Sequence, residues 1–273
     1  MLDIVSSQAS KLIDITNSSI QNSNSKTKLI TITSGKGGVG KSTMTANIAF
    51  LLAKRGLRVA VLDADIGLAN MQVLFNVKPQ NTFFEYINGF KTLNEIITFT
   101  PYENVYLIAG KSGFQYASNV NSFIFTRVVK EIISLNKFDI LLVDTGAGLN
   151  EYVKEFLSIS NNILAITTTD PSALTDVYSL MKMLSIDKDK LMLCFNHTKN
   201  YQIGETIANS LINLAKKNSL KEDFMVEYVG NVSTSSNISI TGRLRKLFAN
   251  EFSSDETTKQ LLFIIDKLLK SIY

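Results

Sequence analysis

Cysteine, proline and histidine are scarce in this sequence, and each shortage excludes a class of protein. The 273 residues include one cysteine, one histidine, 3 prolines and 14 glycines, which excludes disordered and collagen-like chains. Cys194 alone cannot form a disulfide within the chain or supply a multi-cysteine zinc or iron–sulfur site, and we expect it buried in a strand. His197 has no second histidine for a metal-binding pair, and we expect it in a loop.

Long apolar runs and a large net charge are also missing. No run approaches the roughly 18 apolar residues that span a bilayer. Residues 1–4 lack the basic and apolar stretches of a secretory signal, so we expect a cytoplasmic protein. The 28 basic and 24 acidic residues give a net charge of +4. This value is too small to argue for a nucleic-acid partner.

The first 27 residues differ in pattern from the rest of the chain. Their apolar side chains recur at spacings of three and four, which predicts a short amphipathic helix. The following residues, 17–27, are rich in serine and asparagine, and about eleven such residues reach on the order of 20 Å. We expect residues 1–27 to be a tethered helix and linker, with a helix packed on the domain as the alternative, and residues 28–273 to be one domain. The helical stripe consists of Leu2, Val5, Ala9, Leu12, Ile13 and Thr16.

Short apolar segments alternate with longer helical patterns from residue 28 onward. The short segments are rich in isoleucine, valine and leucine, as are strands buried on both faces of a parallel sheet. Alternating strands and helices imply right-handed βαβ units. We therefore expect an α/β fold with a doubly wound, mostly parallel sheet and helices on both faces. The predicted strands are 29–33, 59–63, 105–109, 140–144, 163–167, 191–196 and 226–230, and the main predicted helices are 42–55, 119–135, 175–184, 203–217 and 257–273.

A phosphate-binding loop is the strongest motif in the chain. Residues 35–43 read Gly-Lys-Gly-Gly-Val-Gly-Lys-Ser-Thr, which has the P-loop spacing of two glycines five apart followed by lysine and serine. Glycines let backbone amides close around phosphate oxygens, and the next helix adds the positive end of its dipole. Lys41 supplies charge at the β- and γ-phosphates, and Ser42 offers a hydroxyl ligand to Mg²⁺. The expected nucleotide-binding residues here are Gly35, Gly37, Gly38, Val39, Gly40, Lys41, Ser42 and Thr43.

Two carboxylate groups follow predicted strands, at the edge where such sheets bind ligands. Asp63 and Asp65 lie at the end of the strand 59–63. Asp144 ends the strand 140–144 and begins the string Asp-Thr-Gly-Ala-Gly, which has the form of a Walker B strand. We expect Asp144 to hold Mg²⁺ directly or through water. Taken alone, Asp63 and Asp65 have a solvated turn as the alternative.

Lys36 makes the loop more specific than a general P-loop. Residues 36–43 resemble the deviant Walker A motif of the MinD/ParA ATPases, and residues 62–70 resemble the second motif of that family. The resemblance covers nearly the whole domain. It implies a P-loop NTPase fold of the SIMIBI/ParA type, in which an ATP-dependent homodimer sandwiches two ATP molecules.

The resemblance also implies a role for individual residues. Lys36 would act on the phosphates of the opposite subunit, where a cation neutralises charge at the γ-phosphate. Asp65 would position the attacking water, and Asp63 would support Mg²⁺ and the dimer. Asn196 matches the position that reads the adenine edge, where an amide can pair with a donor and an acceptor. The expected catalytic residues are thus Lys36, Lys41 and Asp65, and the expected metal ligands are Ser42, Asp63 and Asp144.

Three strings are similar to the FlhG group of flagellar-number regulators within that family. Residues 144–148 lack the proline that MinD usually carries there, and residues 168–179 resemble an FlhG strand-to-helix segment. Residues 8–12 resemble the motif with which FlhG stimulates the GTPase FlhF, although Ser7 and Ile13 replace the usual aspartate and arginine. The resemblance implies a slow Mg²⁺-dependent ATPase that regulates flagellar number or placement. An FlhF-type GTPase and flagellar basal-body proteins would be its partners.

The end of the chain has two alternative interpretations. Apolar residues of the predicted helix 257–273 lie on one face and lysines flank them, which suits either a final core helix or contact with anionic lipid. Core packing is the favoured alternative, because little chain follows. Residues 243–248 are a second basic and apolar stretch, which we expect to be a surface helix. The apolar face of the last helix consists of Leu261, Leu262, Ile265, Leu268, Leu269 and Ile272.

Three further functions remain as alternatives. A MinD/ParA-like ATPase of division-site selection or DNA partition would share the motifs, but partition proteins need a basic patch for DNA. A metal-cluster carrier needs several cysteines, which Cys194 alone does not provide. A non-hydrolysing nucleotide scaffold is disfavoured because Lys36, Lys41, Asp65 and Asp144 are all present.

Overall fold

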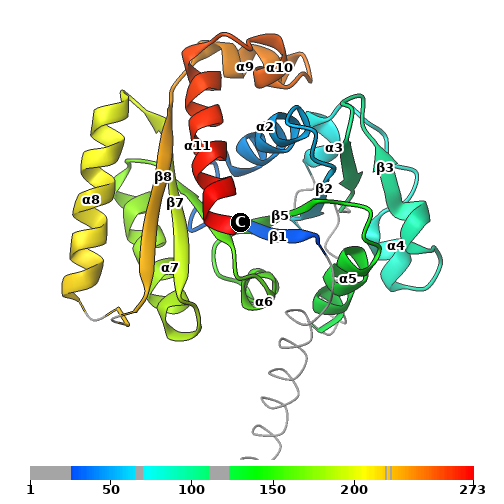
Figure 1. The fold of residues 1–273 in the computed structure, drawn as a ribbon, viewed down its shortest axis with the longest axis horizontal. Helices are drawn as coiled ribbons and strands as arrows, with labels where there is room; N and C mark the ends of the chain where they lie inside the picture. Colours follow the sequence, from blue (N-terminus) through cyan, green and yellow to red (C-terminus); the bar gives the residue numbers. More distant parts are fainter. Residues whose placement is uncertain (1–25, 66–69, 111–122, 219, 222) are drawn as a thin grey trace, which may run out of the picture.

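The computed structural model describes residues 26–65, 70–110, 123–218, 220–221 and 223–273. In these ranges eight strands form one sheet, in the order β3-β4-β2-β5-β1-β6-β7-β8 (Figure 1). Strand β3 is antiparallel to β4, and all other neighbouring strands are parallel. The predicted α/β fold with a mostly parallel sheet is therefore confirmed. The strands are β1 (Lys28–Ser34), β2 (Val59–Ala64), β3 (Ile97–Phe99), β4 (Val105–Ile108), β5 (Ile140–Ala147), β6 (Ile163–Thr167), β7 (Lys190–Thr198) and β8 (Met225–Ser233).

Helices cover both faces of this sheet (Figure 1). Because successive strand residues point to opposite faces, Ile30 and Ile32 of β1 pack with α2 and α11, whereas Leu29 packs with α5. In β7, Cys194 joins the first of these clusters and Phe195 packs on the other face, so the prediction of a buried strand cysteine is confirmed. The described helices are α2 (Lys41–Ala53), α3 (Met71–Leu74), α4 (Phe83–Ile87), the 3₁₀ helix η1 (Leu93–Ile96), α5 (Phe123–Ser134), α6 (Glu151–Ile159), α7 (Pro171–Asp187), α8 (Tyr201–Lys217), α9 (Ser236–Arg243), α10 (Phe248–Glu251) and α11 (Glu256–Ile272).

The C-terminal helix α11 is part of the core. Its apolar face packs against β8 and α2, and Leu261, Ile265 and Leu268 are buried there. Leu262 and Leu269 lie at the margins of this face and are partly buried. The structure thus agrees with core packing, the first of the two alternatives. Among the described helices, none has both the length and the apolar content to cross a bilayer.

Three local features differ from the sequence predictions. Strand β3 was not predicted, because a three-residue edge strand leaves little periodicity to recognise. The surface helix expected at 243–248 is wrong, since α9 ends at Arg243, α10 begins at Phe248, and Arg245 between them has a left-handed φ of 52°. Thr27, expected in the linker, is buried and belongs to the domain. The predicted N-terminal helix lies outside the described residues.

Candidate functional site

The phosphate-binding loop connects β1 to α2 at the carboxyl edge of the sheet. Two of its glycines have left-handed backbones, with φ of 79° at Gly38 and 84° at Gly40, which other residues adopt only with strain. Gly40 is also the N-cap of α2. Because the first helical amides have no partners within their helix, the loop and this helix start present a set of donors to an anion.

Two glycines of the loop are required by close contacts with other segments. A Cβ on Gly35 would lie 2.7 Å from the backbone of Asp176 in α7. A Cβ on Gly40 would lie 2.3 Å from the amide nitrogen of Asn196 in β7. Gly37 is less crowded, since its Cβ would meet the Ala147 side chain at 3.8 Å, an ordinary contact. The glycines therefore let the loop pack closely against the ends of the strands.

Three donors from the start of α2 converge on Asp144 of β5. The Lys41 ammonium lies 3.0 Å from one carboxylate oxygen and the Ser42 hydroxyl 2.6 Å from the other. The Thr45 hydroxyl donates to the same carboxylate at 2.9 Å. Sequence reasoning missed Thr45, although a hydroxyl three residues after Ser42 lies on the same helical face. The fold thus places the phosphate-binding loop next to the strand that the sequence predicts as a Walker B strand.

Asp63 is buried beside Asp144 near the carboxyl ends of the strands. The two residues are direct partners in the parallel pairing of β2 and β5. Asp63 accepts hydrogen bonds from the backbone amides of Met71 and Asp65. Burial, and secondly the negative charge of Asp144, raise the pKa of Asp63 to about 7. A cation at this edge would favour the charged form of Asp63.

The donor set at this edge suits a magnesium ion. Asp144 and Asp63 offer carboxylate oxygens, and Ser42 offers a hydroxyl. Mg²⁺ usually takes one or two carboxylates and completes its shell with waters and substrate phosphates. The residues predicted as metal ligands are therefore close in space and chemically suitable.

Asp65 and Lys36 lie at the same ends of the strands but are more exposed than Asp63 and Asp144. Asp65 is half-buried, and its carboxylate lies 3.6 Å from where a Cβ on Gly146 would be, so it approaches the loop after Asp144. Lys36 is exposed, and its ammonium donates to the Ser172 hydroxyl at 2.7 Å in the first turn of α7. The role of Lys36 across a dimer interface stays a prediction.

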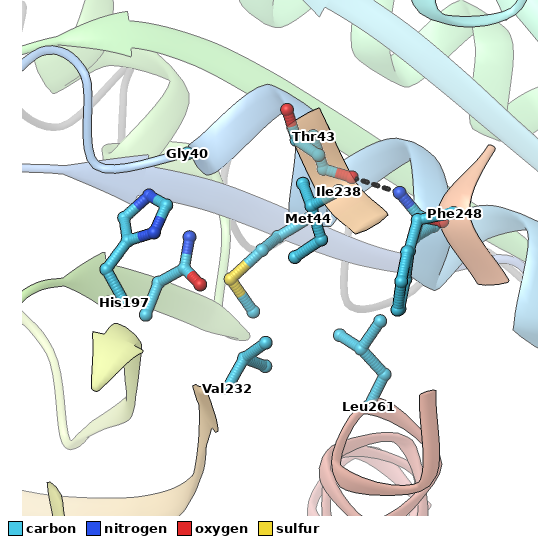
Figure 2. Close-up of a pocket in the computed structure, with 10 residues that line it drawn as sticks. Gly40, Thr43, Met44, His197, Val232, Ile238, Phe248 and Leu261 are labelled. Atoms are coloured by element: carbon cyan, nitrogen blue, oxygen red, sulfur yellow. Dashed lines mark hydrogen bonds between the residues drawn. The ribbon is translucent and has the colours of Figure 1, made fainter. Parts of the chain in front are cut away.

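A pocket adjoins the loop on the side of β7 (Figure 2). Asn196 is 4% exposed, and its amide nitrogen donates to the Val39 carbonyl at 2.9 Å. Its amide oxygen has no hydrogen-bond partner within the described chain. A buried acceptor without a partner costs on the order of 1–3 kcal/mol, so a ligand that donates to it would be favoured. The pocket is lined by Gly40, Thr43, Met44, Asn47, Asn196, His197, Val232, Ile238, Phe248 and Leu261.

His197 belongs to this pocket, and its expected place in a loop is wrong. It lies near the end of β7, where the pairing with β8 shifts register between Phe195 and Thr198. Its φ of 55° is left-handed, and its side chain lies beside Gly40 (Figure 2). Such backbone irregularities are frequent at functional sites. The sequence signal was its position next to Asn196.

Comparisons with known proteins agree with this geometry. The ParA family model, described as NUBPL iron-transfer P-loop NTPase, matches residues 25–269. Flagellum site-determining protein YlxH of Helicobacter pylori is 36% identical over 275 residues, which cover 97% of this chain and 92% of the relative. Antiactivator FleN of Pseudomonas aeruginosa is 31% identical over 206 residues, covering 74% of this chain and 72% of FleN. Septum site-determining protein MinD of Thermotoga maritima is 29% identical over 181 residues, 64% of this chain and 66% of MinD.

Solved structures share the fold at lower identity. The MinC:MinD cell division protein complex of Aquifex aeolicus contains a chain with a TM-score of 0.74 and 22% identity, covering 89% of this chain and 96% of that one. MinD of Pyrococcus horikoshii complexed with Mg-ADP has a TM-score of 0.73 and 22% identity, again covering 89% and 96%. These similarities extend over nearly all of the described sheet and helices.

Proposed function

This chain belongs to the ParA family of P-loop NTPases, and on that basis we propose that it is an ATP-dependent dimerising switch that regulates the number or placement of flagella. The flagellar part of the proposal is supported by YlxH, whose similarity covers 97% of this chain, and by FleN. The enzymatic part is a slow, Mg²⁺-dependent hydrolysis of ATP. The monomer–dimer change, selected by the γ-phosphate, would be the output of the switch.

The convergence of Lys41 and Ser42 on Asp144 is the observation that carries the proposal. In a nucleotide complex the loop amides and Lys41 would bind the phosphates, and Ser42, Asp144 and Asp63 would hold Mg²⁺. The ion, when bound, would neutralise charge on the phosphate oxygens. Gly35, Gly37, Gly38, Val39, Gly40 and Thr43 would form the remainder of the phosphate cradle.

Asp65 and Lys36 would complete the catalytic arrangement. Asp65, at the outer edge beside Gly146, would orient water for in-line attack on the γ-phosphate. Lys36 would leave its hydrogen bond to Ser172 and contact the phosphates of the second subunit. A positive charge from a neighbouring chain stabilises the negative charge that develops during phosphoryl transfer.

Asn196 would select adenine. Its buried amide oxygen lacks a donor within the described chain, and the exocyclic amino group of adenine could donate to it. Guanine presents a carbonyl oxygen at the equivalent position, which would leave both oxygens without a donor. We therefore expect ATP to bind more tightly than GTP, by about tenfold to a hundredfold.

The partners would be proteins of the flagellar system. An FlhF-type GTPase would bind the N-terminal segment, and basal-body proteins would respond to the dimer. We propose a cytoplasmic location, with contact to the inner face of the cell membrane as a second state of the ATP-bound dimer. The apolar face of α11 lies in the core, so it does not support lipid contact by that face.

A division-site or DNA-partition role is the second candidate. It is favoured by the similarity to MinD of Thermotoga maritima. The two functions predict different cellular defects. Deletion of the gene should change the number or position of flagella under the first function, and the position of septa or the inheritance of DNA under the second.

Calorimetry tests the nucleotide site directly. Titration of Mg-ATP into the full chain should release heat with a stoichiometry of one per chain, and Lys41→Ala should remove most of that heat. Circular dichroism should show that the variant stays folded. Absence of binding by the unchanged protein would refute the proposal at its base.

A further inference from the structure

A second groove lies at the amino ends of the parallel strands, whereas the phosphate loop lies at their carboxyl ends. It is formed where the parallel strands begin, since Arg58 directly precedes β2 and Phe138 lies just before β5. Phe99 also lines it, from β3, which is an edge strand of the sheet (Figure 1). The cavity has a volume of about 300 Å³. Nothing in the proposed nucleotide chemistry uses this surface.

The floor of the groove is a row of aromatic rings. The rings of Phe99 and Tyr106 are 5.6 Å apart between centroids, and those of Tyr106 and Phe138 are 5.3 Å apart. Ile97 extends the apolar surface beside them. Phe99 is 77% exposed. Burial of a phenylalanine side chain lowers the free energy by about 1.5–3 kcal/mol, so covering this ring would be favourable. The groove therefore presents apolar surface that a matching segment would cover.

The chain enters the domain at the inner end of this groove. The Thr27 hydroxyl donates to the carbonyl of Phe138 at 2.7 Å, and the Lys28 amide donates to the carbonyl of Asp139 at 2.9 Å. Residues 1–25 are thus attached next to one of the aromatic rings. A linker of about ten residues reaches on the order of 18 Å, which keeps the preceding segment close to the groove.

Residues 2–16 are long enough to cover the groove. A fifteen-residue helix is about 22 Å long, and the way from β5 across β2 and β4 to β3 is three strand spacings, or about 14 Å. Arg58 and Lys137 also line the groove. Arg58 forms an ion pair with Asp139 at 2.8 Å, and the Lys137 ammonium donates to the Asn94 side chain at 2.7 Å.

We propose that residues 2–16 dock on this groove of their own chain, with the apolar stripe on Phe99, Tyr106 and Phe138. In this docked state the apolar stripe of residues 2–16 is covered, and it becomes available when a partner protein displaces the segment from the groove. Since the groove and the phosphate loop lie at opposite ends of the parallel strands, docking leaves the nucleotide site open. The inference stands apart from the proposed ATPase activity, which can fail or succeed without it.

Hydrogen exchange of the full chain, without nucleotide, tests the docking. Amides of residues 2–16 should exchange about tenfold more slowly than in a free peptide of the same sequence. Phe99→Asp should remove most of this protection. The matched control is Phe90→Asp, because Phe90 is also 77% exposed but does not line the groove; it should keep the protection. Both variants should keep the circular dichroism and the ATP binding of the unchanged chain.

Three results would overturn the proposal. The first is exchange of residues 2–16 in the unchanged chain as fast as in the free peptide. The second is equal loss of protection in both phenylalanine variants. The third is protection that depends on protein concentration, which would mean that a second copy of the chain covers the groove. Conversely, removal of residues 1–25 should speed exchange in residues 97–106 if the docking is correct.

Discussion

The buried carboxylate of Asp63 should make the nucleotide-free protein less stable as the pH rises. The folded state raises the pKa of this group from 3.8 to about 7. Below 3.8 the carboxyl is protonated in both states, so it has no effect on stability. Between these values only the unfolded chain releases the proton, and the free energy of unfolding falls until the pH passes the folded pKa. Above the folded pKa the loss is constant at about 4 kcal/mol.

Replacement of Asp63 by asparagine should remove this loss. Asparagine keeps an acceptor oxygen for the amides of Met71 or Asp65 and cannot ionise. Asp63→Asn should therefore be more stable than the unchanged protein above about pH 7, by a few kcal/mol. The two proteins should converge toward acid pH. Urea denaturation followed by circular dichroism, without nucleotide or Mg²⁺, measures both curves.

Asp139→Asn is a control of opposite sign. The Arg58 guanidinium donates two hydrogen bonds to the Asp139 carboxylate and the Arg58 backbone amide donates a third, and these lower the pKa of Asp139. This group therefore contributes stability above its ordinary pKa and loses it as the pH falls. The asparagine variant should be less stable than the unchanged protein at neutral pH. Equal pH dependence of Asp63→Asn and the unchanged protein would refute the reasoning about Asp63.

The remaining predictions concern the proposed switch. Lys36→Ala should abolish ATP-dependent dimerisation and leave monomeric binding of ATP, as measured by light scattering and calorimetry; dimers that persist would remove Lys36 from the interface. Asp65→Ala should release phosphate at least tenfold more slowly and accumulate the ATP-bound dimer; an unchanged rate would exclude Asp65 from catalysis. Asn196→Ala should weaken ATP binding about tenfold or more and reduce the preference over GTP, because the acceptor for the amino group is lost; an unaltered preference in competition binding would contradict its role.

The phosphate loop could be predicted from sequence because its determinants are local. A strand, two glycines with left-handed backbones and the start of a helix follow one another directly in the sequence. Glycine adopts the φ angles at positions 38 and 40 without strain, whereas other residues do not. The parallel sheet was also predictable, because strands covered on both faces are apolar throughout. Strand β3 was missed because three residues at the edge need little burial.

The arrangement around the loop depends on pairing between distant segments. Asp63 faces Asp144 because β2 pairs with β5, and Asn196 reaches the Val39 carbonyl across 157 residues of sequence. The hydrogen bond from the Thr45 hydroxyl to the Asp144 carboxylate also depends on how α2 packs on β5. Sequence spacing does not give the order of the strands in a sheet, and that order decides which of these side chains meet.

By itself the sequence determined the residue types that can bind a phosphate and the strands that must be buried. Those features arise from backbone geometry and from hydrophobic periodicity, which each short segment carries alone. Only the tertiary structure decided that α11 is a core helix, that His197 lines a pocket, and that an aromatic groove lies where the chain enters the domain. Each of these depends on which surfaces meet when the sheet assembles, and that outcome is a property of the whole chain.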